Sequence, residues 1–448
     1  MADRNYFCVE NIADFSENIR FVANKSFTYP VLEYSLDDGE TWVTYSIGSN
    51  IQLAPNTKCY FRGNNSTFNS NTAYIYFTSD HNTADGLKNL NISGNIMSLV
   101  DKTCRRSIIP CDGCFYHLFH SNHNFNNTLD LVLPATTLKG YCYQGMFYGC
   151  TSLTIAPDLP ATTLMYYCYG SMFEGCTSLK QAPELLATTL ATRCYNSMFS
   201  GCTSLTTAPN LSATTLALEC YRSMFSGCTS LTTIPELPAT TLSNWGYRDM
   251  FNGCTSLEHI PALPAKILAN SCYTRMFNNC SSIKLSEVPT EECSYKYRLP
   301  ILGNIQQTVD NAASDMFTGT GGVTTIELNK DYYINVKVIP NYINYQIHNL
   351  AFTTTAEIIS QDLTDVTIVL SSIDCFKLPE TINVTGADYS YTSTTGEIVL
   401  TNLTDNITVR ADGVEILPTP QVYLNYNTLN ISPVYRADNY EINFEEVK

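Results

Sequence analysis

The densest group of possible metal ligands lies at residues 111–123, which read CDGCFYHLFHSNH. Cysteine or histidine recurs at every third position of this stretch, as Cys111, Cys114, His117, His120 and His123. Thiolates and imidazoles are the usual ligands of zinc, so four of these side chains could bind the metal if the segment brought them together. Surface histidines are the alternative.

Most of the 18 cysteines of the chain fall into two regular series. One series is Cys114, Cys142, Cys168, Cys194, Cys220 and Cys272, with Gly246 in one place, and the other is Cys150, Cys176, Cys202, Cys228, Cys254 and Cys280, with Asn122 in one place. The spacings of eight and 18 residues match no usual zinc pattern. Because glycine and asparagine can replace cysteine within the series, we predict buried structural thiols.

These series belong to a repeat with a strict period of 26 residues. Met-Phe pairs occur at this interval from Met146 to Phe277, and Leu-Pro-Ala-Thr-Thr-Leu or a variant of it begins at the same interval from Leu133 to Leu263. Self-similarity at a fixed period is the signature of a solenoid, and this period lies within the leucine-rich-repeat range with one short strand per coil. The sequence therefore predicts a leucine-rich-repeat solenoid.

Within one coil the repeat separates inward from outward positions. We expect Leu231, Ile234 and Leu237 to point inward from the strand, and Tyr221, Met224 and Phe225 to fill the interior from the opposite side, while Thr232, Thr233 and Glu236 point outward. The same alignment places Cys114 in a buried column and the three histidines at positions held elsewhere by Gly145, Tyr148 and Thr151. Surface histidines are therefore favoured over a metal site.

The repeat becomes irregular at both ends. An upstream match at 114–119 is offset by 28 residues, and a late match at 316–319 follows an interruption. Solenoids need atypical terminal coils to cover the open core. The solenoid with its caps is therefore expected to span residues 99–335.

The outward face of the predicted strands is the candidate recognition face, comprising Asp158, Glu184, Thr207, Thr233, Glu236 and His259. Stacked strands lie about 4.8 Å apart, so Asp158 and Glu184 would be neighbours that a cation could bridge. A solvated face is the favoured alternative, because Asn210 takes the equivalent place in the next coil. No metal or other cofactor is expected.

Composition narrows the class of function. The net charge is −16 and the chain has no long basic run, which argues against nucleic-acid binding. The start has no secretory signal, and no apolar run reaches the length of a membrane span, so we expect a chain made in the cytoplasm without membrane insertion. The usual motifs of hydrolases, phosphate-binding loops and metalloproteases are missing, and a non-enzymatic protein is expected.

The regions that flank the repeat are rich in short extended runs between turn residues. Residues 1–98 are expected to form a small β-domain of hairpins. Residues 336–414 favour an Ig-like β-sandwich. Residues 415–448 hold too few strands for an independent fold and are expected to be a partial β-module or a docking segment.

The phrases Met-Phe-x-Gly-Cys-Thr-Ser-Leu resemble the BspA-like leucine-rich repeats of surface proteins from gut and oral anaerobes, and similar repeats are encoded by phages of gut bacteria. The segments at 32–42, 60–65 and 92–98 look like the region that commonly precedes such repeats. The resemblance covers residues 30–330 and implies adhesion or recognition, with no catalytic residues to carry over.

From this resemblance and the start without an export signal, the expected function is a bacteriophage virion protein, a tail- or head-attached fibre or adhesin for host recognition. Its expected partners are other virion proteins, a host surface receptor or glycan, and a further copy of the same chain. A bacterial cell-surface adhesin is one alternative. A carbohydrate-binding module is another, although the tyrosines at the regular position of each coil, such as Tyr221, favour core packing.

Overall fold

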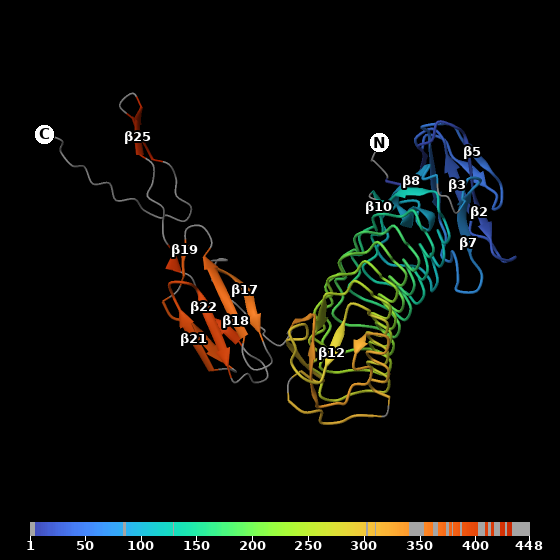
Figure 1. Ribbon diagram of the computed structural model, residues 1–448. Helices are drawn as coiled ribbons and strands as arrows, with labels where there is room; N and C mark the ends of the chain where they lie inside the picture. The colour runs from blue at the N-terminus through green and yellow to red at the C-terminus, as the bar shows by residue number, and fades with distance from the viewer. Residues whose placement is uncertain are drawn as a thin grey trace. The chain divides into compact units, whose positions relative to one another are not determined.

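The computed structural model describes residues 5–83, 87–128, 130–301, 303–309 and 311–339, and beyond them 354–361, 366–372, 376–378, 380–385, 388–401, 408–410, 414–415, 422–425 and 428–431. The described chain is mainly β, with one short 3₁₀ helix, η1 (Ile96–Leu99), and no α-helix (Figure 1). It divides into two compact units, Met1–Asn341 and Tyr342–Lys448. None of the helices in the described residues is long and apolar enough to span a membrane.

The first unit begins with two sheets. One has the strand order β10-β8-β1-β6-β3-β4 with β9 beside β8, and the other has the order β5-β2-β7. The strands are β1 (Phe7–Asn11), β2 (Glu17–Ala23), β3 (Leu32–Ser35), β4 (Val43–Tyr45), β5 (Ile51–Leu53), β6 (Lys58–Gly63), β7 (Ile75–Ser79), β8 (Leu90–Asn95), β9 (Phe125–Asn127) and β10 (Leu131–Val132). The extended runs predicted in residues 1–98 are therefore confirmed as strands.

Aromatic side chains join the two sheets and continue into the repeat. The ring of Phe21 on β2 lies 5.2 Å from that of Phe61 on β6 and 5.5 Å from that of Phe77 on β7, and all three are fully buried. Phe7 and Phe77 in turn contact Phe119, with centroid distances of 5.6 and 6.3 Å. The N-terminal β-region thus covers the first end of the repeat core.

The repeat units stack through a regular alternation of backbone hydrogen bonds, which residues 219–228 exemplify. The amides of Tyr221, Ser223 and Phe225 donate to carbonyl oxygens of the next unit over 2.8–3.1 Å, and those of Arg222, Met224 and Cys228 donate within their own turn over 3.1–3.3 Å. Each unit therefore satisfies its own backbone and that of its neighbour at the same time. The stacked turns are seen from cyan to yellow in Figure 1.

This tight turn requires a left-handed residue at every fourth position. In the same unit Glu219, Ser223 and Gly227 have φ of 53°, 54° and 75°. Glycine adopts this conformation without steric cost, whereas other residues pay about 1–2 kcal/mol each. Stacking must offset that cost, since the pattern recurs in every unit.

Two ladders of single-residue parallel bridges connect the units on the remaining sides. One runs through Ile155, Gln181, Thr207 and Thr233, and the other through the second threonine of the Leu-Pro-Ala-Thr-Thr-Leu phrase. The short strand predicted for each coil is thus reduced to one residue between 133 and 258. In the first ladder a proline follows each bridge by two residues, as Pro235 follows Thr233, and it has no amide hydrogen to donate.

The interior consists of columns of identical side chains. Leu231, Ile234 and Leu237 are buried, as are Tyr221, Met224 and Phe225, so the predicted inward positions are confirmed. The tyrosine rings of adjacent units lie 5.8–6.0 Å apart and are parallel to within 8°, which is the offset stacking that aromatic rings favour.

The first unit ends with short strands around the late match of the repeat: β11 (His259–Pro261), β12 (Lys284–Ser286), β13 (Tyr295–Arg298), β14 (Gly321–Gly322), β15 (Asp331–Ile334) and β16 (Lys337–Ile339). Phe317 stacks on Phe277 at 5.3 Å and so continues the phenylalanine column. Tyr297 packs edge-on against Phe317, which closes the column.

The second unit contains an antiparallel sheet of order β17-β18-β22-β21 and three two-stranded pairs, β19-β24, β20-β23 and β25-β26. The bounds are β17 (Thr354–Gln361), β18 (Val366–Ser372), β19 (Phe376–Lys377), β20 (Asn383–Thr385), β21 (Asp388–Thr392), β22 (Glu397–Thr401), β23 (Thr408–Arg410), β24 (Val414–Glu415), β25 (Val422–Asn425) and β26 (Thr428–Ile431). Ile398 and Leu400 are buried on alternate positions of β22. Most of the predicted segment 415–448 lies outside the described residues.

Candidate recognition face

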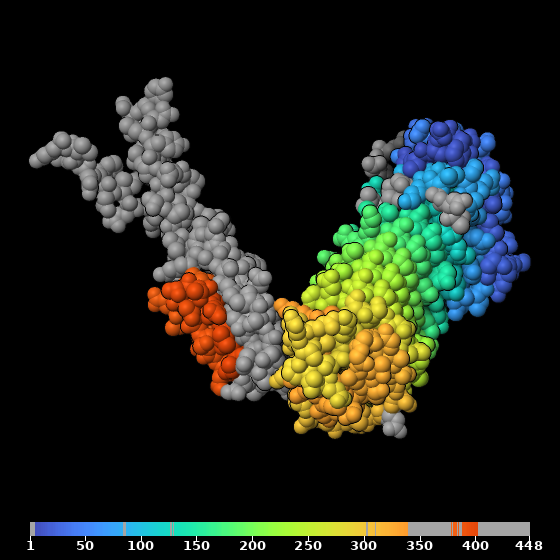
Figure 2. Space-filling model, in the orientation of Figure 1, coloured from blue at the N-terminus to red at the C-terminus, as the bar shows by residue number. Residues whose placement is uncertain are grey.

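The first bridge ladder carries the predicted recognition face. Thr207 and Thr233 are direct bridge partners in adjacent units, and both are exposed. Gln181 and Ile155 continue the ladder towards the N-terminus and are exposed as well. We call these four residues the exposed ladder. The repeat units that carry it form one continuous surface in Figure 2.

The predicted acidic residues follow the exposed ladder by three positions in three of its four units, and Asn210 takes this position after Thr207. Asp158, Glu184 and Glu236 are exposed, and Asp158 and Glu184 lie in units that are joined by the bridge between Ile155 and Gln181. Partial burial raises the pKa of Glu236 above its ordinary value. No group of three or more metal-ligating side chains converges within the described part of the chain. We call the exposed carboxylates Asp158, Glu184 and Glu236 the acidic row.

His259 occupies the position of Thr233 in the next unit but differs from it in its surroundings. It is half-buried and begins β11, where it pairs with Lys337 of β16. Its Nδ1 atom is buried without a hydrogen-bond partner. The structure therefore places His259 at the end of the predicted face, against a neighbouring strand.

The Cys/His stretch at 111–123 does not come together around one point. Cys114 is fully buried, whereas His123 bonds through Nδ1 to the Thr151 hydroxyl at 2.7 Å. His117 packs between aromatic rings, 4.2 Å from that of Tyr116, and burial followed by the nearby His120 lowers the pKa of His117 to about 4. The two half-buried histidines His117 and His120 therefore favour the neutral form.

Cys111 is the exception among the thiols of this stretch. It is half-buried, and a hydrogen bond from the Cys114 thiol lowers the pKa of Cys111 to about 7, against the effect of burial. Sequence reasoning grouped Cys111 with the histidines as a ligand. The structure instead gives it an environment that favours the thiolate.

The two cysteine columns are buried, as predicted, and their thiols have a definite structural role. In the second column each thiol donates to the phenylalanine carbonyl of the preceding unit, as Cys228 does to Phe199 over 3.1 Å and Cys254 to Phe225 over 3.2 Å. Burial raises the pKa of Cys228 to about 12. A protonated, hydrogen-bonded thiol is a poor nucleophile and a poor metal ligand, so these columns serve packing.

The outer side of the turns bears ion pairs that sequence reasoning missed. The nearly buried carboxylate of Glu219 accepts hydrogen bonds from Arg193 of the preceding unit and from Arg222 of its own, the latter over 2.9 Å. Asp249 is paired in the same way with Arg248 and with Arg275 of the next unit. The sequence could have predicted the pair of Arg193 and Glu219, because the two residues occupy the same position of successive 26-residue repeats.

Comparisons with known proteins do not assign this chain to a family. No family model matches it, and neither does any curated protein or solved structure.

Proposed function

We propose that this chain is a non-enzymatic recognition protein built on a leucine-rich-repeat solenoid. The observation that carries the proposal is the contrast between its inside and its outside. Identical side chains fill the core, whereas the exposed ladder and the acidic row present residues that vary from unit to unit, such as Gln181 and Thr207 or Asp158 and Glu184. Stacked repeats use such extended faces for binding.

The distribution of reactive groups supports a role in binding. The thiols of both cysteine columns are buried with raised pKa values, and the two half-buried histidines have lowered ones. Neither kind of group has the pKa near neutrality that general acid–base catalysis or thiolate chemistry favours. Cys111 alone departs from this pattern among the described thiols whose pKa is shifted.

The finer fold assignments are part of the proposal. Parallel bridges, inter-unit hydrogen bonds and stacked rings at 26-residue intervals support the solenoid. In the second unit the four-stranded antiparallel sheet, with the pairs β19-β24 and β20-β23 as candidates for a facing layer, supports an Ig-like sandwich. Such a module would serve to attach or space the recognition region.

The proposed setting is a bacteriophage virion, in which the chain is a tail- or head-attached fibre or adhesin that contacts the host. Support comes from the resemblance of the repeat to those encoded by phages of gut bacteria. Its partners would be other virion proteins and a host receptor or glycan. A bacterial cell-surface adhesin with the same binding face is the second candidate.

Immunogold labelling separates these two settings. Antibodies raised against the repeat region should label purified phage particles at a fixed position on the tail or head, with particles of an unrelated phage as the control. Labelling of intact bacterial cells grown free of phage, with unlabelled particles, would instead assign the chain to the cell surface. Absence of label from both would reject the recognition role at either surface.

A further inference from the structure

An open pocket lies where the N-terminal β-region meets the repeat. Its volume is about 610 Å³, and its lining comes from the loop after β6, the segment that follows η1 and the first regular repeat unit: Ser66, Arg105, Arg106, Ser107, Ile108, Ile109, Pro110 and Lys139. Three of these eight residues are cationic, although the chain has a net charge of −16. The pocket is therefore a locally basic site on a protein of negative net charge.

The arginines of this pocket differ from the other arginines of the protein. Arg105 and Arg106 have no carboxylate partner among the described residues, and neither has Lys139. Every other arginine whose side chain is described has a carboxylate oxygen within 3.9 Å, namely Arg20, Arg62, Arg193, Arg222, Arg248, Arg275 and Arg298. The two described arginines without a carboxylate partner are thus adjacent and both line this pocket.

The carboxylates of Asp101 and Asp112 bond to other donors and make no ion pair with the pocket cations. Asp101 accepts the backbone amides of Arg105 and Arg106 through one oxygen, Oδ2, at 3.2 and 3.0 Å, and binds Thr103 as well. Asp112 accepts the amide of Gly140 at 3.0 Å and the hydroxyl of Tyr166 at 2.6 Å. Both acids therefore fix the backbone around the pocket and leave its guanidinium and ammonium groups free.

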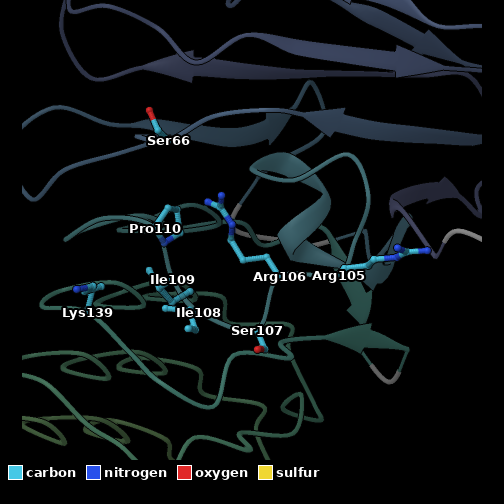
Figure 3. A pocket seen from close by; sticks show the side chains of 8 residues that line it. All are labelled: Ser66, Arg105, Arg106, Ser107, Ile108, Ile109, Pro110 and Lys139. Carbon is cyan, nitrogen blue, oxygen red and sulfur yellow. The ribbon is translucent and has the colours of Figure 1, made fainter.

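The pocket is also held in shape by the repeat. Ile108 forms a parallel bridge with Thr137, and the amide of Thr136 donates to the carbonyl of Ser107 at 3.2 Å. Arg106 extends alongside Pro110 towards Ser66, with Lys139 beyond the isoleucines, whereas Arg105 extends in the opposite direction (Figure 3). Arg106 and Lys139 are therefore the cations that the lining directs along the side of Pro110 and the isoleucines.

The lining combines these charges with an apolar surface. Ile108 is 55% exposed, although its neighbour Ile109 is fully buried. A guanidinium binds carboxylates through paired hydrogen bonds, and an exposed apolar patch packs against the less polar face of a sugar ring. The overall negative charge of the chain repels extended polyanions such as nucleic acid, so a ligand with few, spaced charges fits better.

From these observations we infer that the pocket binds a carboxylated saccharide, with the carboxylate on Arg106 and Lys139 and the ring against Ile108. This inference deepens the proposed function, since it names a ligand class for a recognition protein and adds a binding site away from the exposed ladder. Binding of soluble sugars tests the pocket, whereas immunogold labelling tests the virion or cell-surface location. The pocket inference and the proposed setting can therefore fail independently.

Calorimetry on the full chain gives the test, with an oligogalacturonate as the acidic probe and a neutral galactose oligomer of equal length as its control. The wild-type chain should bind the acidic oligomer and not the neutral one, and the affinity should fall as salt rises. Arg106→Gln and Lys139→Gln should each weaken binding at least about tenfold. Lys180→Gln, at an exposed lysine outside the pocket lining, makes the same change in net charge and should alter affinity less than about twofold.

Four results would overturn the inference. They are no binding of the acidic oligomer to the wild-type chain at millimolar concentration, equal binding of the neutral oligomer, equal weakening by Lys180→Gln and Arg106→Gln, and tighter binding of a single-stranded DNA oligonucleotide than of the acidic sugar. Because all three substituted side chains are exposed, each variant should keep the unfolding midpoint of the wild type, which a thermal scan verifies.

Discussion

Replacing Phe199 and Phe225 with leucine tests whether the buried rings act as one column. Both side chains are fully buried, and their rings lie 5.7 Å apart with planes 6° apart. Leucine keeps most of the apolar volume, so imperfect repacking should cost about 1 kcal/mol per replacement. Each lost stacking contact adds about 0.5–1 kcal/mol, and Phe225 makes a second such contact with Phe251 at 5.6 Å. A single variant should therefore lose about 2–3 kcal/mol of unfolding free energy.

The double variant measures the coupling free energy between Phe199 and Phe225. Because the contact between Phe199 and Phe225 is shared, the double replacement should cost about 0.5–1 kcal/mol less than the sum of the single ones. Phe147 provides the matched control, since its stacking neighbours are Phe119 and Phe173 and neither contacts Phe225. The pair Phe147 and Phe225 should be additive to within about 0.5 kcal/mol.

Urea unfolding followed by far-UV circular dichroism measures these free energies by linear extrapolation, with Trp245 fluorescence as a second probe within the repeat. Equal coupling in both pairs, or none between Phe199 and Phe225, would refute the reasoning that stacked rings of adjacent units stabilise each other directly.

Three further predictions follow from single residues. Gly227→Ala should cost about 1 kcal/mol in urea unfolding because φ is 75° there, whereas Ser200→Ala, at a half-buried position without positive φ, should be nearly neutral, and equal effects would contradict this. Under native conditions iodoacetamide should modify Cys111 with a midpoint near pH 7 and leave Cys228, whose pKa is about 12, unmodified until unfolding. Peptide mass mapping checks this, and equal labelling of both thiols would count against it. The folded pKa of His117, about 4, lies below the ordinary value of 6.5, so the unfolded state binds more protons and stability should fall as the pH drops through this window. His117→Asn should flatten that fall, as unfolding midpoints at pH 7, 5.5 and 4.5 would show, and an unchanged slope would remove His117 as the cause.

The repeat made the core predictable, because 26-residue spacing puts equivalent positions of successive units in register. That register was enough to place Tyr221 and Phe225 inside and Thr233 outside. The predicted strand was wrong in extent, since the structure shows a single bridge at Thr233. The left-handed turn was also missed, because Ser223 and Glu219 are not residues that usually mark positive φ.

The pocket was harder to predict, because it depends on side-chain contacts that form only in the folded chain. Asp101 and Asp112 look like free acids in the sequence, and only the folded chain shows them occupied by backbone amides, a threonine and a tyrosine hydroxyl. The pocket depends on that occupation, which leaves Arg106 without a partner. Charge pairs within the repeat follow the 26-residue spacing, as Arg193 and Glu219 do, whereas the contacts of Asp101 and Asp112 around the pocket follow no such spacing.

Binding of the fluorescently labelled chain to intact host cells tests the central claim, that the exposed ladder recognises a surface partner. The ladder variant Thr207→Lys/Thr233→Lys is compared with Thr177→Lys/Thr229→Lys, which adds the same charge at exposed threonines off the ladder. Saturable wild-type binding that falls at least about tenfold in the ladder variant and less than about twofold in the control is the predicted result. Equal binding by both variants would contradict the account.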